Sequence, residues 1–148
     1  MTDLVFVDTN TVVYTRDQRD PWKAKRAAQW LARLDEARSL VVSPQVLNEA
    51  YSVGVRKFPG AGRDAVAEWV SAFVPFCTAP MDGKVFGTAL AVEREFRFSW
   101  WDSLILASAM RAGCAYLLSE DMQHRQTVGS LRVIDPFREE PSALFPNR

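Results

Sequence analysis

The sequence predicts an α/β protein, a three-layer sandwich in which a short, mainly parallel central sheet is flanked by helices. Apolar runs typical of strands buried on both faces occur at 4–7, 39–42, 116–118 and 131–134. The segments between these runs carry apolar residues at helical spacing. Strands that alternate with helices are joined by crossovers, which make neighbouring strands parallel. We expect a single domain over 1–148, with an irregular tail from about residue 135.

The composition is that of a globular protein, with 48% hydrophobic and 24% charged residues. No apolar run approaches the roughly 18 residues of a membrane span, and no secretory signal begins the chain, so we expect a cytoplasmic protein without a membrane segment. Eighteen basic residues balance eighteen acidic ones. This balance excludes a broad positive field for non-specific nucleic-acid binding, and any nucleic-acid contact must be local.

The cysteines and the histidine restrict the chemistry further. Cys77 and Cys114 lack CxxC spacing and lie among apolar residues, which predicts reduced thiols in the core. His124 is the only histidine. Zinc sites rich in histidine are therefore excluded, and a Ser-His-Asp triad would depend on this one residue.

The first half of the chain contains two buried strands and three predicted helices. The strand at 4–7 ends at Asp8, and a short helix is expected over 11–15. Asp20-Pro21 is typical of a helix start and predicts a helix over 22–37. Ser43-Pro44 repeats this pattern and opens a helix to about residue 57, with Glu49 at the edge of its apolar face.

The second half begins with a helix predicted over 64–74, a brief strand over 76–78 and a helix capped by Asp82. The run 99–102, Ser-Trp-Trp-Asp, has the form of a capping box. It opens a helix over 103–112 that is apolar on nearly all sides, as expected in the interior. Asp102 therefore lies in the first turn of a buried helix.

Four acidic residues are predicted to converge at one edge of the sheet. Asp8 and Asp121 each follow a buried strand, Asp102 opens a helix, and Glu49 lies within two turns of its helix start. Such convergence costs free energy unless a cation neutralises the carboxylates or some are protonated. Carboxylate oxygens favour Mg²⁺ or Mn²⁺ over zinc. The alternative is purely structural: helix caps for Asp8 and Asp102, a turn for Asp121, and a solvated position for Glu49.

These acidic motifs resemble those of PIN-domain ribonucleases, and the resemblance covers essentially the whole chain. It rests on 6–10 (Phe-Val-Asp-Thr-Asn), Glu49 after Ser43-Pro44, Trp101-Asp102, and 117–121 (Leu-Leu-Ser-Glu-Asp). The size and the segment from Gln123 to Phe137 resemble more narrowly the VapC toxins of toxin-antitoxin pairs. The resemblance implies a metal-dependent endoribonuclease, usually a homodimer, that a small antitoxin protein holds inactive.

Hydrolysis of RNA phosphodiester bonds needs a cation that activates water and polarises the phosphoryl group. We expect Asp8 and Asp102 to bind Mg²⁺ or Mn²⁺ directly, and Glu49 and Asp121 to act through water or at a second ion. Partners that hold these carboxylates or the waters are expected among Thr9, Asn10 and Ser119.

Two surfaces are candidates for binding partners. Five basic side chains follow the first strand and either grip RNA phosphates or form a solvated face: Arg16, Arg19, Lys23, Lys25 and Arg26. Trp22 and Trp30 lie two helical turns apart and are candidates for an exposed aromatic row that receives an antitoxin helix. The alternative is that both tryptophans belong to the core.

Two other functions remain open from the sequence. A haloacid-dehalogenase-like phosphatase also has a nucleophilic Asp after its first strand, in an Asp-x-Asp pattern, but Asn10 replaces the second Asp here. A non-catalytic α/β module that binds RNA or protein would use the same acids only as caps. Metal binding separates the nuclease from the non-catalytic module.

Overall fold

The computed structural model describes residues 2–146 and contains a five-stranded sheet. The strand order is β2-β1-β3-β5-β4, with β2, β1, β3 and β5 parallel and β4 antiparallel to β5. The strands are β1 (Val5–Val7), β2 (Leu40–Val41), β3 (Tyr116–Leu118), β4 (Thr127–Val128) and β5 (Leu131–Ile134). This mainly parallel sheet, flanked by helices, confirms the predicted fold class.

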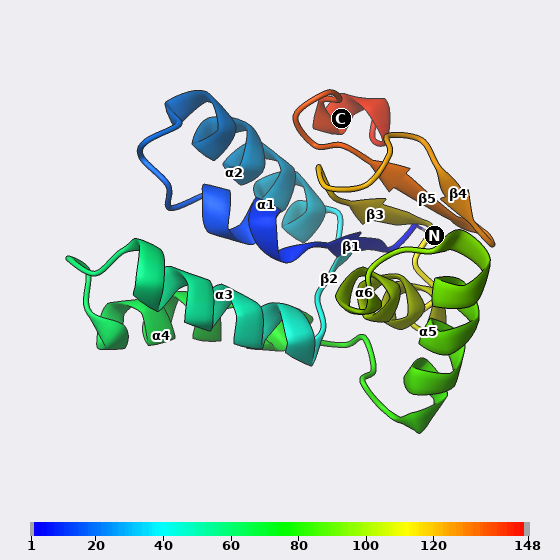
Figure 1. Ribbon diagram of the computed structural model, residues 1–148. Helices are drawn as coiled ribbons and strands as arrows, with labels where there is room; N and C mark the ends of the chain where they lie inside the picture. Colours follow the sequence, from blue (N-terminus) through cyan, green and yellow to red (C-terminus); the bar gives the residue numbers. More distant parts are fainter. Residues whose placement is uncertain (1, 147–148) are drawn as a thin grey trace.

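The helices form layers around the strands (Figure 1). Helix α2 lies on one side of the sheet and α5 with α6 on the other, while α3 and α4 form a pair that extends outward. They are α1 (Thr9–Tyr14), α2 (Pro21–Glu36), α3 (Pro44–Lys57), α4 (Arg63–Ser71), α5 (Gly83–Phe96) and α6 (Trp100–Arg111), with 3₁₀ turns η1 (Val74–Phe76) and η2 (Pro141–Ala143). Across the described part of the chain, none of the helices has both the length and the apolar character of a membrane span.

The predicted helix starts are confirmed by hydrogen bonds. The side chains of Asp20, Ser43, Asp82 and Ser99 each accept a hydrogen bond from a backbone N–H three residues later. These bonds satisfy donors that have no partner within the helix. Because two of these caps open α3 and α6, they determine where the side chains of the first turns of those helices lie.

The apolar strands place the sheet in the core. Val5, Phe6 and Val7 of β1 are completely buried, as are Leu117 and Leu118 of β3. Helix α6 is buried along its whole middle, which confirms the expectation of an interior helix. The carboxyl ends of β1 and β3, and the polar residues after them, are therefore held by a tightly packed core.

Three local predictions were wrong. Helix α1 begins at Thr9 rather than at 11, because Asp8 caps it directly. The segment 76–78 is not a strand, because Phe76 belongs to the turn η1 and only Cys77 makes an isolated bridge, to Val42 next to β2. The two-residue strand β4, too short to give a period-two pattern, was not predicted.

The predicted exposed row of tryptophans was also wrong. Trp22 is 53% exposed, but Trp30 is completely buried, and its indole Nε1 donates to the carbonyl oxygen of Pro136 at 2.9 Å. Eight residues of an α-helix turn the side chain by about 80° beyond two full turns, so the two rings lie on different faces. Of the two cysteines, both free, Cys114 is buried as predicted, whereas Cys77 is only partly buried.

Substitution of each tryptophan should distinguish the buried environment of Trp30 from the exposed one of Trp22. Trp30→Ala should lower the free energy of unfolding by about 3–5 kcal/mol, because it leaves a cavity and an unpaired carbonyl. The matched control Trp22→Ala should cost about 1 kcal/mol at most, since it removes only an exposed ring. Urea unfolding measures both values. Equal costs would contradict the assignment of Trp30 to the core.

Candidate functional site

The parallel register of β1 and β3 brings Asp8 and Ser119 together. Val7 pairs with Leu118, so the residues that follow these two strands leave the sheet side by side. Ser119 Oγ donates to Asp8 Oδ2 at 3.0 Å, and Asp8 Oδ1 accepts from the backbone N–H of Thr9 at 2.7 Å. Both carboxylate oxygens of this buried side chain are thus held in place.

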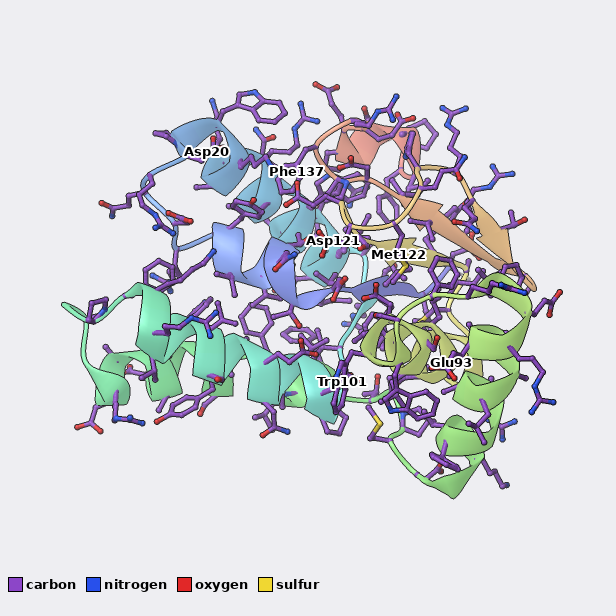
Figure 2. The ribbon with its side chains drawn as sticks, viewed as in Figure 1. Asp20, Glu93, Trp101, Asp121, Met122 and Phe137 are labelled. Atoms are coloured by element: carbon purple, nitrogen blue, oxygen red, sulfur yellow. The ribbon has the colours of Figure 1, made fainter. Side chains whose placement is uncertain are left out.

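Asp121 is held by the same two elements. Its backbone N–H donates to Ser119 Oγ at 3.3 Å, and its Oδ2 accepts from Asn10 Nδ2 at 2.6 Å. Ser119 and Asn10 therefore connect the turn after β3 to the start of α1. Figure 2 shows Asp121 at the middle of the molecule, close to the beginning of α1.

Asp102 approaches from a third element. It lies in the first turn of α6, where its backbone N–H donates to Ser99 Oγ at 3.1 Å, and its side chain is partly buried. Its negative charge raises the pKa of Asp8 and also that of Asp121. Asp102 therefore lies near enough to Asp8 and Asp121 for its charge to act on both.

Repulsion among the carboxylates at this edge of the sheet disfavours their ionised forms. Burial is the main cause that raises the pKa of Asp8 to about 7, and the charges of Asp121 and Asp102 add to it. The hydrogen bonds from Thr9 and Ser119 act in the opposite direction. The pKa of Asp121 is raised by burial and by the charges of Glu120 and Asp102. A proton or a cation at this edge relieves the repulsion.

Glu49 lies beside this group rather than within it. It lines a pocket of about 470 Å³ together with Trp101, the residue that precedes Asp102. Its Oε1 atom is buried and has no hydrogen-bond partner. Asp8, Asp102 and Asp121 thus lie near enough for their charges to interact, whereas Glu49 lines the adjoining pocket.

Three of the five basic residues expected to grip RNA are engaged with acids or carbonyls of the chain. Arg19 Nε is 2.9 Å from Asp17 Oδ1, and Lys23 Nζ is 2.7 Å from Glu120 Oε2. Arg26 Nη1 donates to the carbonyl oxygen of Glu139 at 3.0 Å. Each of these three side chains therefore already makes a contact within the protein.

The other two basic residues differ from these. The Arg16 guanidinium lies 5.8 Å from the ring centroid of Trp69, and Lys25 is exposed on α2. RNA contact stays a prediction for both.

The single histidine does not belong to the acidic group. His124 Nδ1 accepts from the backbone N–H of Asp135 at 3.0 Å, and His124 Nε2 is 3.3 Å from Glu139 Oε1. It connects the loop after β3 to the segment after β5. The acidic edge therefore offers oxygen atoms, not imidazole, to any ligand.

The sequence matches the PIN domain family over residues 5–129. The chain belongs to this family. A search of curated proteins found no match. PIN domains are generally nucleases that use divalent metal ions, so this chain has a nuclease fold and its substrate class is nucleic acid. The match gives no support to the phosphatase or the non-catalytic alternative.

The residues of this PIN domain fit a divalent cation. The group at the sheet edge supplies only carboxylate and hydroxyl oxygens, which suit a hard cation. The pKa of Asp8 is raised by burial and by the charges of Asp121 and Asp102, and Glu49 Oε1 is buried without a hydrogen-bond partner among the described residues. Within residues 2–146 the acids do not close into a set of three or more ready to ligate one ion.

Gln45 was not among the site residues predicted from the sequence. This side chain is 9% exposed on the first turn of α3, its Nε2 donates to the carbonyl oxygen of Trp101 at 3.3 Å, and its Oε1 is buried without a partner. Glutamine is mostly exposed in proteins, so its position in the sequence carries no sign of this burial. Only the packing of α3 against α6 reveals it.

The pKa of Asp8 predicts how stability depends on pH. The folded chain keeps a proton on Asp8 up to about pH 7, whereas the unfolded chain loses it near the ordinary aspartate value. Stability is therefore lost as pH rises between about 4 and 7. In chelator, Asp8→Asn should raise the melting temperature by several degrees at pH 8 and hardly at all at pH 4.

The control is Asp3→Asn, an exposed carboxyl before β1. It should change the melting temperature equally little at both pH values. A gain for Asp8→Asn that is the same at pH 4 and pH 8 would contradict the elevated pKa.

Proposed function

We propose that this PIN domain is an Mg²⁺- or Mn²⁺-dependent endoribonuclease, and that it is the toxin of a toxin-antitoxin pair of the VapC kind. One observation carries the nuclease chemistry: the buried Asp8 carboxylate is held by Thr9 and Ser119 and lies near the charges of Asp102 and Asp121. Such a group gains free energy from a divalent cation, and a phosphodiester supplies further oxygen ligands.

In this proposal Asp8 and Asp102 bind the cation directly, and Asp121 and Glu49 act through water or at a second ion. When bound, the metal lowers the pKa of a water molecule and polarises the phosphoryl oxygen. Ser119 orients Asp8, and Asn10 orients Asp121, through the hydrogen bonds described above. Thr9 contributes its backbone N–H, and its buried hydroxyl oxygen has no hydrogen-bond partner among the described residues.

Asn10 also supports a nuclease over the phosphatase alternative. In an Asp-x-Asp phosphatase the residue at this place is a general acid, which an amide cannot be. Here the amide of Asn10 donates a hydrogen bond of 2.6 Å to Asp121. Its role is therefore to orient a carboxylate and not to transfer a proton.

A groove beyond α1 supports a nucleic-acid substrate. It has a volume of about 810 Å³ and lies between the loop 16–19 and the hairpin of α3 and α4. Arg16, Lys57 and Trp69 line it, together with the paired Arg19 and Asp17 and with Glu68. With a formal net charge of zero, contact with the RNA backbone has to depend on such local groups, and selectivity has to come from the shape of the RNA.

Removal of the carboxylates should abolish cleavage without unfolding the chain. We expect Asp8→Asn and Asp102→Asn each to lower the cleavage rate at least about a hundredfold, because each removes a charge that holds the cation. Glu95→Gln on α5, an exposed acid outside the site, is the matched control and should cleave like the wild type. Gel assays of labelled RNA in Mg²⁺, Mn²⁺ or chelator measure the rates. Full activity of Asp8→Asn, or of the wild type in chelator, would refute the assignment.

The proposed biological role rests on the resemblance to VapC toxins. It includes a single domain over 1–148, a homodimer, a cytoplasmic location and a cognate antitoxin protein. The antitoxin would neutralise the acidic edge with a basic side chain, as a cation does. Because Trp30 is buried, the surface that binds the antitoxin cannot include both tryptophans, although Trp22 remains exposed.

An antitoxin that inserts a basic group should compete with the metal. We expect the chain to stop growth when expressed alone and to be harmless with its neighbouring small protein. Titration of the purified complex with Mn²⁺ should release the antitoxin, whereas titration with Na⁺ to equal ionic strength should not. Harmless expression of an active chain would contradict the toxin role and leave the nuclease proposal standing.

A further inference from the structure

The pocket beside the acidic edge has its own chemistry. It lies where the starts of α3 and α6 meet the loop before α5, and Gln45, Met81, Trp101 and Leu104 line it. Figure 2 shows Trp101 at this junction. The indole is 64% exposed and Met81 is 38% exposed, so a flat apolar ligand has a surface to stack on.

Two acceptor atoms of residues that line this pocket have no donor among the described residues. Gln45 Oε1 and Glu49 Oε1 are both buried, and neither has a hydrogen-bond partner. The two residues are one helical turn apart on α3, so they belong to the same face. A buried acceptor without a donor costs free energy, which a ligand with N–H groups would recover.

The pocket lies next to the acidic residues Asp102 and Glu49. Trp101 immediately precedes Asp102, and its carbonyl oxygen accepts the hydrogen bond from Gln45. Glu49 lines the same pocket. A ligand seated here therefore lies next to a phosphate held at the acidic edge.

We propose that this pocket binds one nucleobase of the RNA strand next to the cleaved bond, stacked on Trp101 with its exocyclic amino group donating to Gln45. The inference rests on the proposed nuclease function and adds base selectivity to it. A nucleobase combines the two features that the pocket requires, a flat ring for stacking and N–H donors at its edge. The side chain of another protein copy would satisfy the apolar surface but not the unpaired acceptors, unless it brought donors of its own.

Cytosine and uracil provide the sharpest test, because they are equal in size. Cytosine carries an amino donor at the place where uracil carries a carbonyl acceptor. Facing Gln45 Oε1, the amino group forms a hydrogen bond and the carbonyl is repelled. We therefore expect the wild type, in chelator, to bind an oligocytidine about tenfold more tightly than an oligouridine of the same length, measured by fluorescence anisotropy.

Three variants separate stacking from hydrogen bonding. Trp101→Ala should weaken the binding of both oligomers about tenfold, because one base loses its stacking partner, and Trp101→Phe should restore most of it. Gln45→Met should abolish the preference for cytosine. Trp22→Ala removes another exposed indole, from α2, and should change neither affinity nor preference.

The outcomes distinguish failure of this inference from failure of the proposed function. If the wild type cleaves mixed-sequence RNA in Mn²⁺, but Trp101→Ala and Gln45→Met bind both oligomers like the wild type, the base site is refuted and the nuclease stands. If the wild type neither binds nor cleaves RNA, both fail. If Trp101→Ala turns a dimer into a monomer in light scattering while RNA binding is unchanged, a second copy covers this face and the base site is refuted.

Discussion

The burial of one carboxylate at the end of β1 is the constraint on which the rest of the site depends. Asp8 is 7% exposed, and its backbone continues directly from a strand that is completely buried. An ionised side chain in such a place needs hydrogen bonds or a cation, and within residues 2–146 it receives two neutral donors, from Thr9 and Ser119. The remaining charge is what makes the edge suitable for a divalent ion.

The capping and ligand interpretations of the acids turn out to be compatible. Asp8 does cap α1, and Ser99 caps α6 so that Asp102 lies in its first turn. A cap fixes the rotamer of the capping side chain, and it also fixes the direction of the first turn of its helix. The same local hydrogen bonds that begin these helices therefore also position Asp8 and Asp102, whose charges interact.

The parts that sequence could predict are those with a strong local pattern. The apolar runs of β1 and β3 and the cap of α6 locate Asp8, Asp121 and Asp102, because the ends of parallel strands share one edge. The face that a large side chain occupies on a helix was harder to assign, since Trp30 and Trp22 differ by less than a quarter turn. The burial of Gln45 depends on contacts between α3 and α6, which no local pattern contains. For the same reason sequence alone could not tell that Glu49 lies in a neighbouring pocket.

The most direct test of the account is whether metal binding releases a proton from the acidic edge. Burial raises the pKa of Asp8 to about 7, so at pH 6 a bound cation has to displace its proton. Calorimetric titration with Mn²⁺ at pH 6, in two buffers that differ in ionisation enthalpy, measures the number of protons released. We predict that the wild type releases about one proton for each ion bound, and that Asp8→Asn releases none. Binding of Mn²⁺ to the wild type without proton release, or no binding at all, would contradict it.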